Sequence, residues 1–403
     1  MDSGAKPVDV GTAYGRPKGR HIRELTEVGP GTPMGELLRR YWHPIALCRD
    51  AVKAPKRIRA LGEDLILFRD GQGRPGLVVE RCTHRGASLY FGRVEDAGIR
   101  CCYHGWLYAV DGQCLDKAVE PGGGTRGPGD RQPWYPVREL YGLIFAYMGP
   151  PEKKPALPRY ENLEALRPNE RHEPDDTSFE VGGPPVLDFN WLQHYENFQD
   201  AGHVIWLHFL HSGNQFGDTH RLAGATIDSH AFMNGRSWHL TETGMKYVAV
   251  DKLADGREMR FVVQNVLPNV GIVPEPGNVD EGMSDQVHWL LPIDDTHLRV
   301  FAVRRVDARN PAPLFQFKVN GKVWQHRTDE ERRAHPGDYE AQRGQGSITL
   351  HSHEHLSMTD RGVGMLRRLF KQQLKAMRAG KDPINVRFDE DKPIKVEAGR
   401  FTI

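Results

Sequence analysis

The sequence predicts an α+β fold in two parts, a small all-β domain followed by a larger domain that mixes helices with strands. Between residues 44 and 149, short β-type runs alternate with glycine-rich turns. A stretch rich in proline and charge follows, at 151–185, and is typical of a linker. Beyond it, helix-like and strand-like segments are mixed. We therefore expect an N-terminal helical segment at 1–45 that packs on the larger domain, the all-β domain at 46–155 and the larger domain at 156–403.

Composition and charge exclude several classes of protein. Lys and Arg number 54 against 53 Asp and Glu among 403 residues, and no run of like charge suggests a nucleic-acid partner. The longest apolar stretch, around Leu143–Met148, is far too short to span a bilayer. Residues 1–19 are rich in Gly, Pro and charge and lack the apolar region of a signal peptide. We expect a soluble, cytoplasmic protein with neither nucleic acid nor membrane as a partner.

The first 150 residues are expected to contain one short helix and several strands. The helix is predicted over Gly31–Trp42, with Thr32 as its cap before a proline. The strand-like runs are Leu65–Phe68, Leu77–Val79 and Leu143–Tyr147, the last of the all-β domain.

The larger domain is expected to combine two helices with a set of strands. Leu187–His208 has helical character, and Phe261–Val303 contains several strand-like runs. Val363–Ala379 is an amphipathic helix, ended by Gly380 and Pro383.

The cysteines indicate metal binding. Their odd number argues against a secreted disulfide framework. Three of them lie between residues 82 and 102 and are interleaved with histidines, in a C-x-H motif followed by a C-x-x-H motif. The motifs are Cys82-Thr83-His84 and Cys101-Cys102-Tyr103-His104. Two thiolates and two imidazoles can hold a [2Fe–2S] cluster with two Cys on one iron and two His on the other. The same set also suits tetrahedral zinc.

Neighbouring residues favour the redox centre over zinc. Glycines at 86 and 105 let backbone amides approach cluster sulfurs, and the aromatic rings around His104 exclude water. Cys102 is expected to be a small buried residue, with a ligand role as the alternative. Cys48 and Cys114 lack histidine partners and are interpreted as core thiols.

A second metal motif lies in the predicted helix at 187–208. Asn197, Asp200 and His203 are spaced i, i+3, i+6 and share one helical face. His208 is five residues beyond His203, about 140° round an ideal helix, so both rings reach one ion only if the helix bulges or ends between them. Two His and a carboxylate form the facial triad of non-haem Fe(II) oxygenases. The alternative is that both are core histidines.

These motifs together resemble the oxygenase α subunits of the Rieske non-haem iron oxygenases. The cysteine loops match the CxHRG and CxYHGW patterns of that family, and the helix matches N-x-x-D-x-x-H-x₄-H. The opening GTPMGELLRRYWHPIAL, with the runs at 142–147 and 190–193, is similar to the phthalate dioxygenase-like and aromatic O-demethylase branch. The resemblance implies an N-terminal Rieske domain and a C-terminal catalytic domain of antiparallel sheet and helix, of the helix-grip type.

The resemblance also implies roles for individual residues. The expected cluster ligands are Cys82 and Cys101 on one iron and His84 and His104 on the other. His203 and His208 would bind a mononuclear Fe(II). Asp200, catalytic together with Asn197, would hydrogen-bond His203 and the Rieske histidine His104 of a neighbouring subunit.

The third ligand of the mononuclear iron is assigned by the same resemblance. Asp338 lies where related enzymes carry their carboxylate, counted back from Glu354-His-Leu356. Glu340, Glu354 and Asp360 are its competitors. His351, His353 and His355 alternate like residues on one strand face, and we expect a surface or pocket-lining role for them.

The implied activity is that of one component in a larger system. A separate flavin or ferredoxin-type reductase would pass electrons from NAD(P)H, and the chain would form a head-to-tail homotrimer, α₃. Fe(II) would activate O₂ to hydroxylate an aromatic compound, expected to be an aromatic acid. The alternative is oxidative O-demethylation of a methoxylated acid of vanillate or dehydrodivanillate type. A remote alternative is a Rieske electron-transfer protein with a structural second domain.

Overall fold

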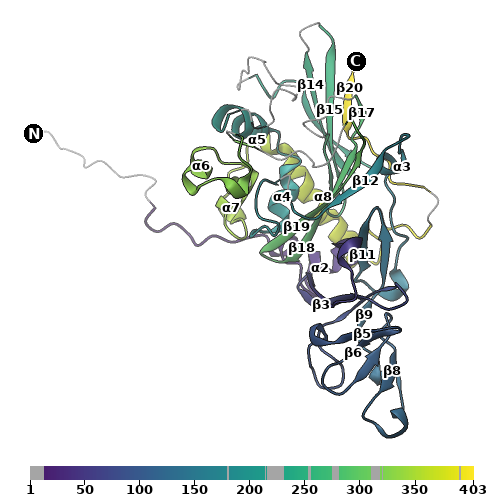
Figure 1. Ribbon diagram of the computed structural model, residues 1–403. Coiled ribbons are helices and arrows are strands. Elements are labelled where there is room, and N and C mark those ends of the chain that lie inside the picture. Colours follow the sequence, from purple (N-terminus) through teal and green to yellow (C-terminus); the bar gives the residue numbers. More distant parts are fainter. Residues whose placement is uncertain are drawn as a thin grey trace, which may run out of the picture.

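The computed structural model describes residues 13–178, 181–213, 215, 231–252, 256–274, 281–309, 318–319, 321–389 and 392–403. Figure 1 shows a narrow, β-rich lower part and a broad upper part in which helices lie beside a large sheet. This arrangement confirms the predicted α+β fold, with the all-β part first in the chain.

Two small antiparallel sheets form the lower part. The first has the order β2 (Lys56–Ala60), β3 (Glu63–Arg69), β4 (Pro75–Val79), β9 (Trp134–Tyr135), and the second the order β5 (Arg93–Glu95), β6 (Gly98–Arg100), β7 (Trp106–Tyr108), β8 (Cys114–Lys117). The runs predicted at 65–68 and 77–79 lie in β3 and β4. Side chains such as Phe68, Leu89 and Tyr108 form a core of their own between the sheets.

A third sheet joins the lower part to the upper one. Its order is β1 (Trp42–Leu47), β11 (Leu143–Tyr147), β10 (Val137–Leu140), and β11 coincides with the last strand predicted for the all-β domain. The predicted helix at 31–42 is shorter, α2 (Pro33–Leu38), although Thr32 caps it by accepting from the Gly35 amide. The last residue of the predicted helix, Trp42, instead begins β1, where it pairs with Tyr147 of β11. The expected boundary between residues 45 and 46 therefore falls inside β1.

One large antiparallel sheet organises the upper part. Its order is β12 (Arg171–Asp175), β19 (His297–Val306), β18 (Gln286–Asp294), β16 (Val270–Ile272), β15 (Glu258–Val266), β14 (Gly244–Lys252), β13 (Arg236–Thr241), and β20 (Gly399–Thr402) pairs with both β15 and β17 (Gly282–Met283). The strands predicted at 261–303 are confirmed, whereas β13 and β14 were not predicted. β12 lies in the predicted linker, and as an edge strand it tolerates Pro174.

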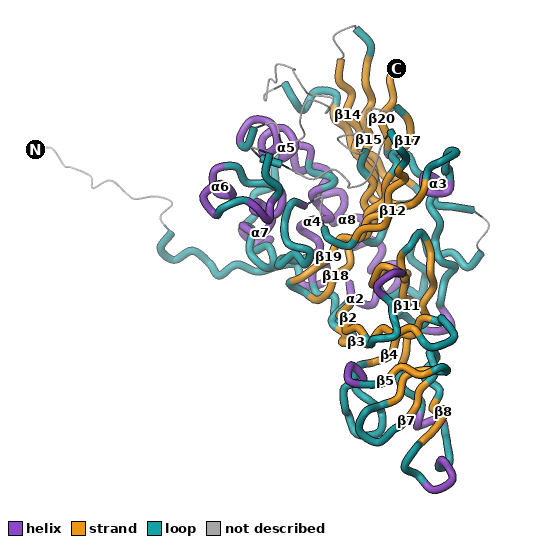
Figure 2. The backbone as a smooth tube through the Cα atoms, viewed as in Figure 1, coloured by secondary structure: helices purple, strands orange, loops and turns teal. Residues whose placement is uncertain are grey.

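Figure 2 shows most of the helices, in purple, in the upper part beside the large sheet. The α-helices of the described residues are α1 (Arg23–Thr26), α2, α3 (Glu161–Glu164), α4 (Trp191–Asn197), α5 (Ala201–Ile205), α6 (Asp329–Ala334), α7 (Asp338–Gly344) and α8 (Arg361–Arg378), of which α3, α4 and α8 contact strands of the large sheet. The predicted amphipathic helix at 363–379 is confirmed as α8, which buries Leu366 and Phe370. No helix in the described ranges is long and apolar enough to cross a membrane.

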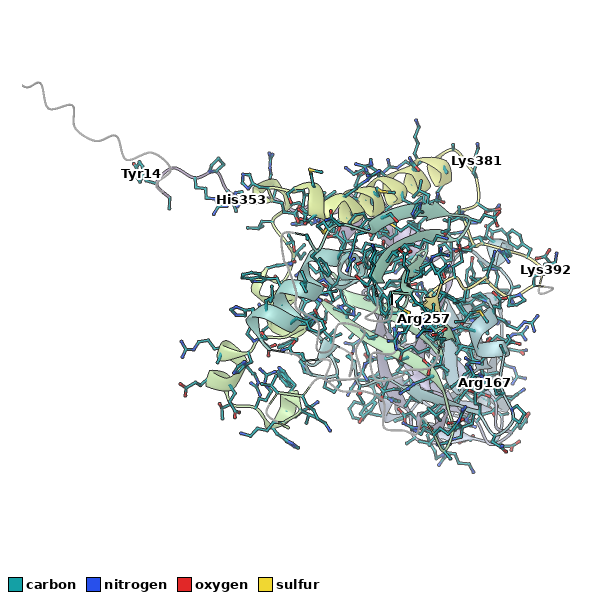
Figure 3. The ribbon with its side chains drawn as sticks, turned by 90° about the horizontal axis from the view of Figure 1, so that it is seen from above. Tyr14, Arg167, Arg257, His353, Lys381 and Lys392 are labelled. Atoms are coloured by element: carbon teal, nitrogen blue, oxygen red, sulfur yellow. The ribbon has the colours of Figure 1, made fainter. Side chains whose placement is uncertain are left out.

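The histidines at 351–355 lie beside the N-terminal segment. Figure 3 shows His353 where this segment, carrying Tyr14, leaves the body of the protein. His351 and His353 belong to a short 3₁₀ helix, so the predicted strand alternation is wrong. The His351 Nδ1 atom accepts from the Ile22 amide (3.2 Å), and the His353 Nε2 atom donates to the Pro17 carbonyl (2.9 Å). These two side chains hold the N-terminal segment at the surface.

Candidate functional site

Two loops with the same backbone pattern carry the first set of metal-binding side chains. In each loop, the glycine four residues after the cysteine donates its amide to that cysteine's carbonyl, Gly86 to Cys82 (2.8 Å) and Gly105 to Cys101 (3.1 Å). Both glycines have φ near +70°, which side-chain-bearing residues rarely adopt. The turn therefore depends on glycine and places each cysteine and its histidine on one tight loop.

The four side chains are arranged with sulfur inside and nitrogen outside. Cys82 and Cys101 are buried, whereas His84 and His104 are partly exposed and have ring centroids 4.5 Å apart. The Tyr108 hydroxyl lies 3.1 Å from the Cys82 sulfur. Two inner thiols and two outer imidazoles fit a [2Fe–2S] group with one sulfur-bound and one nitrogen-bound iron. A zinc ribbon also uses this set, but it does not require this separation into inner and outer donors.

The remaining cysteines differ in their exposure to solvent. Cys102 is exposed, so the expectation of a buried residue is wrong. It lies in the turn directly after the buried Cys101, on the side of that turn that is open to solvent. Cys114 is buried and Cys48 partly buried, in agreement with core thiols.

The predicted helix at 187–208 is not continuous. Residues 187–190 precede α4, and the helix is interrupted between Asn197 and Ala201. A π-helix (Trp206–His211) follows α5 directly. Its wider turn brings residues five apart onto one side, so His203 and His208 face each other with ring centroids 5.3 Å apart. Of the two possibilities that the His-x₄-His spacing left, a bulge or an end of the helix, the structure shows the bulge.

Asp338 completes a set of three side chains. The Asp338 Oδ1 atom lies 3.3 Å from the His208 Nε2 atom and 3.7 Å from the His203 Nε2 atom. One ligand atom from each side chain lies within 4.8 Å of the other two. Burial would raise the pKa of Asp338, but the neighbouring imidazoles, His208 above all, hold that pKa below its ordinary range. The carboxylate is therefore ionised, as a metal ligand must be.

The competing carboxylates are engaged elsewhere. Glu340 caps α7 by accepting from the Gly337 amide (2.8 Å). Glu354 pairs with Arg367 (2.5 Å), and Asp360 accepts from the Ser357 amide (2.6 Å). The geometry favours Asp338.

Hydrogen bonds orient both imidazoles. His208 donates from Nδ1 to the Gln215 side-chain oxygen (2.7 Å), and the Gln215 amide nitrogen donates to the Pro336 carbonyl (3.0 Å). His203 donates from Nδ1 to the Asp200 carbonyl (2.5 Å). Each ring is therefore held with its Nε2 atom turned toward Asp338, as a shared metal ion would require. Gln215 was not predicted, because nothing in the surrounding sequence distinguishes it.

The two other predicted catalytic residues lie beside the three. Asn197 donates from Nδ2 to the Asp338 Oδ1 atom (3.2 Å). The Asp200 Oδ1 atom accepts the amides of Gly202 (2.9 Å) and His203 (3.3 Å), which makes Asp200 the N-cap of α5. Its Oδ2 atom is 3.8 Å from the His203 Nδ1 atom. Within one chain the carboxylate thus caps a helix, and the expected hydrogen bond to His203 comes from the Asp200 backbone.

Comparisons with known proteins agree with both sites. Residues 41–122 match the Rieske [2Fe-2S] domain family. The chain is 45% identical to the phenoxybenzoate dioxygenase subunit alpha of Ectopseudomonas oleovorans, over 97% of this chain and 94% of that protein. It is 37% identical to the oxygenase subunit of a tert-butanol monooxygenase / tert-amyl alcohol desaturase of Aquincola tertiaricarbonis, over 94% and 83%. It is 32% identical to the oxygenase subunit of a 5,5'-dehydrodivanillate O-demethylase of Sphingobium sp., over 89% and 81%.

Solved structures show the same fold. Dicamba monooxygenase superposes with a TM-score of 0.58 at 17% identity, over 85% of this chain and 99% of that one. The identities and coverages of the sequence matches agree with the predicted family and branch, and so do the two sets of donor side chains. The chain belongs to the Rieske non-haem iron oxygenases, as an oxygenase subunit that uses a [2Fe–2S] cluster, a mononuclear iron and electrons from a reductase.

Proposed function

We propose that this chain hydroxylates the ring of an aromatic acid. The observation that carries the proposal is the convergence of His203, His208 and Asp338 behind a π-bulge, in a chain with a second donor set for a cluster. The relative that is 45% identical over nearly the whole chain is named for dioxygenation of phenoxybenzoate, an aromatic acid. The convergence supports oxygenase chemistry at this site, and the relative's name supports the class of substrate.

The proposed ligands are those predicted from the sequence. They are Cys82 and Cys101 with His84 and His104 for the cluster, and His203, His208 and Asp338 for the mononuclear iron. When bound, the cluster relays single electrons and the mononuclear Fe(II) supplies the site of O₂ activation. Gln215 and the Asp200 backbone fix the imidazole tautomers, and the Asn197 amide orients Asp338.

Ring hydroxylation to a cis-diol consumes one O₂, two electrons and two protons, and both oxygen atoms enter the product. The electrons would originate from NAD(P)H and arrive singly through a flavin or ferredoxin-type reductase. Purified protein with such a reductase should show O₂ uptake that depends on an aromatic acid. Isotopically labelled O₂ should place two labelled atoms in the product. A panel of aromatic acids without any substrate-dependent uptake would contradict the proposal.

O-demethylation is the second candidate, favoured by the relative named for dehydrodivanillate O-demethylation. Hydroxylation of a methoxy carbon gives a hemiacetal that releases formaldehyde. Formaldehyde formation from methoxylated acids, with no diol from the unsubstituted acids, would favour this candidate. An electron-transfer role alone is the least supported, because it does not explain why His203, His208 and Asp338 converge.

We further propose a head-to-tail homotrimer in which electrons pass between subunits, from His104 through Asp200 to His203. In Figure 1 the loops around β6 and β8 lie in the lower part of the chain and α5 and α7 in the upper part, which supports transfer from a neighbour. Exposed apolar side chains lie near both sites, Tyr103 beside His104 and Trp206 in the π-helix. Aromatic side chains are enriched in the contact regions between proteins.

Subunit complementation tests the trimer. Chains with His104→Ala and chains with Asp338→Ala should each be inactive. Co-assembled from a mixture, they should regain part of the activity, because an intact cluster then faces an intact iron site across some interfaces. Mixtures that stay inactive after verified subunit exchange would contradict transfer between subunits.

The division of the chain into 46–155 as the Rieske domain and 156–403 as the catalytic domain remains a proposal. The cluster of buried side chains between the two lower sheets supports it, while Leu65 and Leu67 of β3 and Leu77 of β4 belong to the main core. The segment 1–45 is proposed to pack on the catalytic domain, supported by the contacts of α1 and α2 with α8.

A further inference from the structure

Two side-chain contacts join α4 to α7 beside the proposed iron ligands His203, His208 and Asp338. Asn197 on α4 reaches Asp338 on α7 (3.2 Å). One helical turn away, the His194 Nδ1 atom lies 3.1 Å from the Gln342 Oε1 atom. His194 and Asn197 are i, i+3, and Asp338 and Gln342 are i, i+4, so each pair shares one helix face. The His194–Gln342 pair is thus placed next to the proposed iron site by the same two helices.

The His194–Gln342 pair has unused hydrogen-bonding atoms. His194 is 4% exposed and Gln342 3% exposed. The His194 Nε2 and Gln342 Nε2 atoms are buried and have no hydrogen-bond partner among the residues that the structure describes. Buried polar atoms are nearly always paired, so two adjacent orphans need an explanation.

The buried histidine His43, by contrast, has partners for both of its ring nitrogens. His43 is completely buried, and its Nε2 atom donates to the Leu38 carbonyl (2.8 Å). Its Nδ1 atom lies 3.1 Å from the Asn269 Nδ2 atom, so both ring nitrogens are partnered. His194 differs in leaving one nitrogen open, next to an open amide.

The chemistry of the open atoms specifies what they can bind. Burial lowers the pKa of His194 to about 4, so the ring is neutral and carries one proton. With that proton on Nδ1, donated to Gln342 Oε1, the Nε2 atom is an acceptor and the Gln342 amide a donor. If the amide is reversed, the two roles exchange. In either case the pair offers one donor and one acceptor.

A hydroxyl group matches this pair, because it donates one hydrogen bond and accepts another. A carboxylate only accepts and would face the acceptor atom unpaired. The pair lies about one helical turn, ~5.4 Å, from the contact that includes Asp338. A single aromatic ring can carry a hydroxyl and a reacting carbon at about this separation.

We infer that His194 and Gln342 form a binding site for a phenolic hydroxyl on the aromatic substrate, one helical turn from the proposed iron ligands. The inference rests on the proposed function and narrows its substrate class to acids that carry a ring hydroxyl. The two residues select substrate and take no part in the oxygen chemistry.

Matched ligand pairs test the inference. Benzoate and phenoxybenzoate are each compared with their monohydroxylated derivatives by titration calorimetry on the iron-loaded protein. Wild-type protein should bind at least one hydroxylated acid about tenfold more tightly than its parent, since the parent leaves buried polar atoms unpaired. In His194→Leu and in Gln342→Met, this preference should fall to about one, with little change in affinity for the parent acid.

Controls separate a binding role from a structural one. His43→Leu removes a fully paired buried histidine and should lower the melting temperature while keeping the hydroxyl preference. The double variant His194→Leu/Gln342→Met removes both orphans and should melt within a few degrees of wild type. All variants should retain their mononuclear iron.

The outcomes are distinguishable. Wild-type protein that binds no aromatic acid contradicts the proposed function, and the inference with it. Protein that binds each parent and derivative equally, or variants that keep the preference, contradict the inference alone. A substrate complex in which only an ordered water bridges His194 and Gln342 also overturns it.

Discussion

Replacing Asp200 by asparagine separates the helix-capping role that the structure shows for this side chain from the electron-transfer role proposed for it. The Asp200 Oδ1 atom caps α5 through the amides of Gly202 and His203, and the Oδ2 atom faces His203 Nδ1 at 3.8 Å. Asparagine caps a helix about as well as aspartate. Asp200→Asn should therefore keep α5, and with it His203, in place while removing the charge and one acceptor.

The expected magnitudes differ between the two roles. Asp200→Asn should change the free energy of unfolding by well under 1 kcal/mol, whereas Asp200→Ala, which loses the cap, should cost about 1 kcal/mol. In a chain of this length that loss lowers the melting temperature by about 2 °C or less. If the carboxylate also connects His203 to a neighbour's cluster ligand, both variants should slow electron transfer about 10- to 100-fold.

Single-turnover kinetics measure the second role. The cluster is reduced, substrate and O₂ are added, and its reoxidation is followed in the visible spectrum. Asp200→Asn should contain normal iron, reduce normally and reoxidise slowly. Reoxidation at the wild-type rate in Asp200→Asn would refute the connecting role and leave Asp200 as a helix cap only.

Three further outcomes are expected. The purified protein should contain three irons and two acid-labile sulfides per chain, with the rhombic EPR signal of a nitrogen-coordinated cluster when reduced; stoichiometric zinc without sulfide would contradict the cluster. Asp338→Ala should lose the mononuclear iron and all turnover but keep the visible cluster spectrum, since the ligand sets are separate; retained iron would move the ligand elsewhere. Gln215→Leu should lower the affinity for the mononuclear iron about 10- to 100-fold, measured by chelator competition, because His208 loses the acceptor that fixes its tautomer. An unchanged affinity for iron would show that the Pro336 region holds His208 without Gln215.

The cluster loops could be predicted from the sequence because all their determinants are local. A cysteine, a histidine two or three residues later and a glycine with positive φ lie within one turn, and the contact that closes the turn spans four residues. The neighbouring residues do not determine which side of each loop faces the core. The expectation for Cys102 failed for that reason, since the packing of the two sheets decides which neighbour is buried.

The helix with the two histidines could be predicted only in part from the sequence. Its spacing required a bulge or an end of the helix between the two histidines, and the π-helix at Trp206–His211 supplies the bulge. The interruption after Asn197 was not predicted, because Asp200 forms a cap where helical periodicity alone suggests an uninterrupted face. Capping depends on one side-chain rotamer, which a sequence pattern does not specify.

By itself, the sequence determined the two local donor sets, the α+β class and the amphipathic helix α8. Only the tertiary structure decided which carboxylate meets the histidines, that Gln215 holds His208, and that His194 faces Gln342. The carboxylate was suggested earlier by resemblance alone. Asp338 and Gln342 lie more than a hundred residues beyond α4, and their positions follow from how α7 packs on α4. Contacts between such distant segments are set by the packing of the whole core, and no short-range spacing records them.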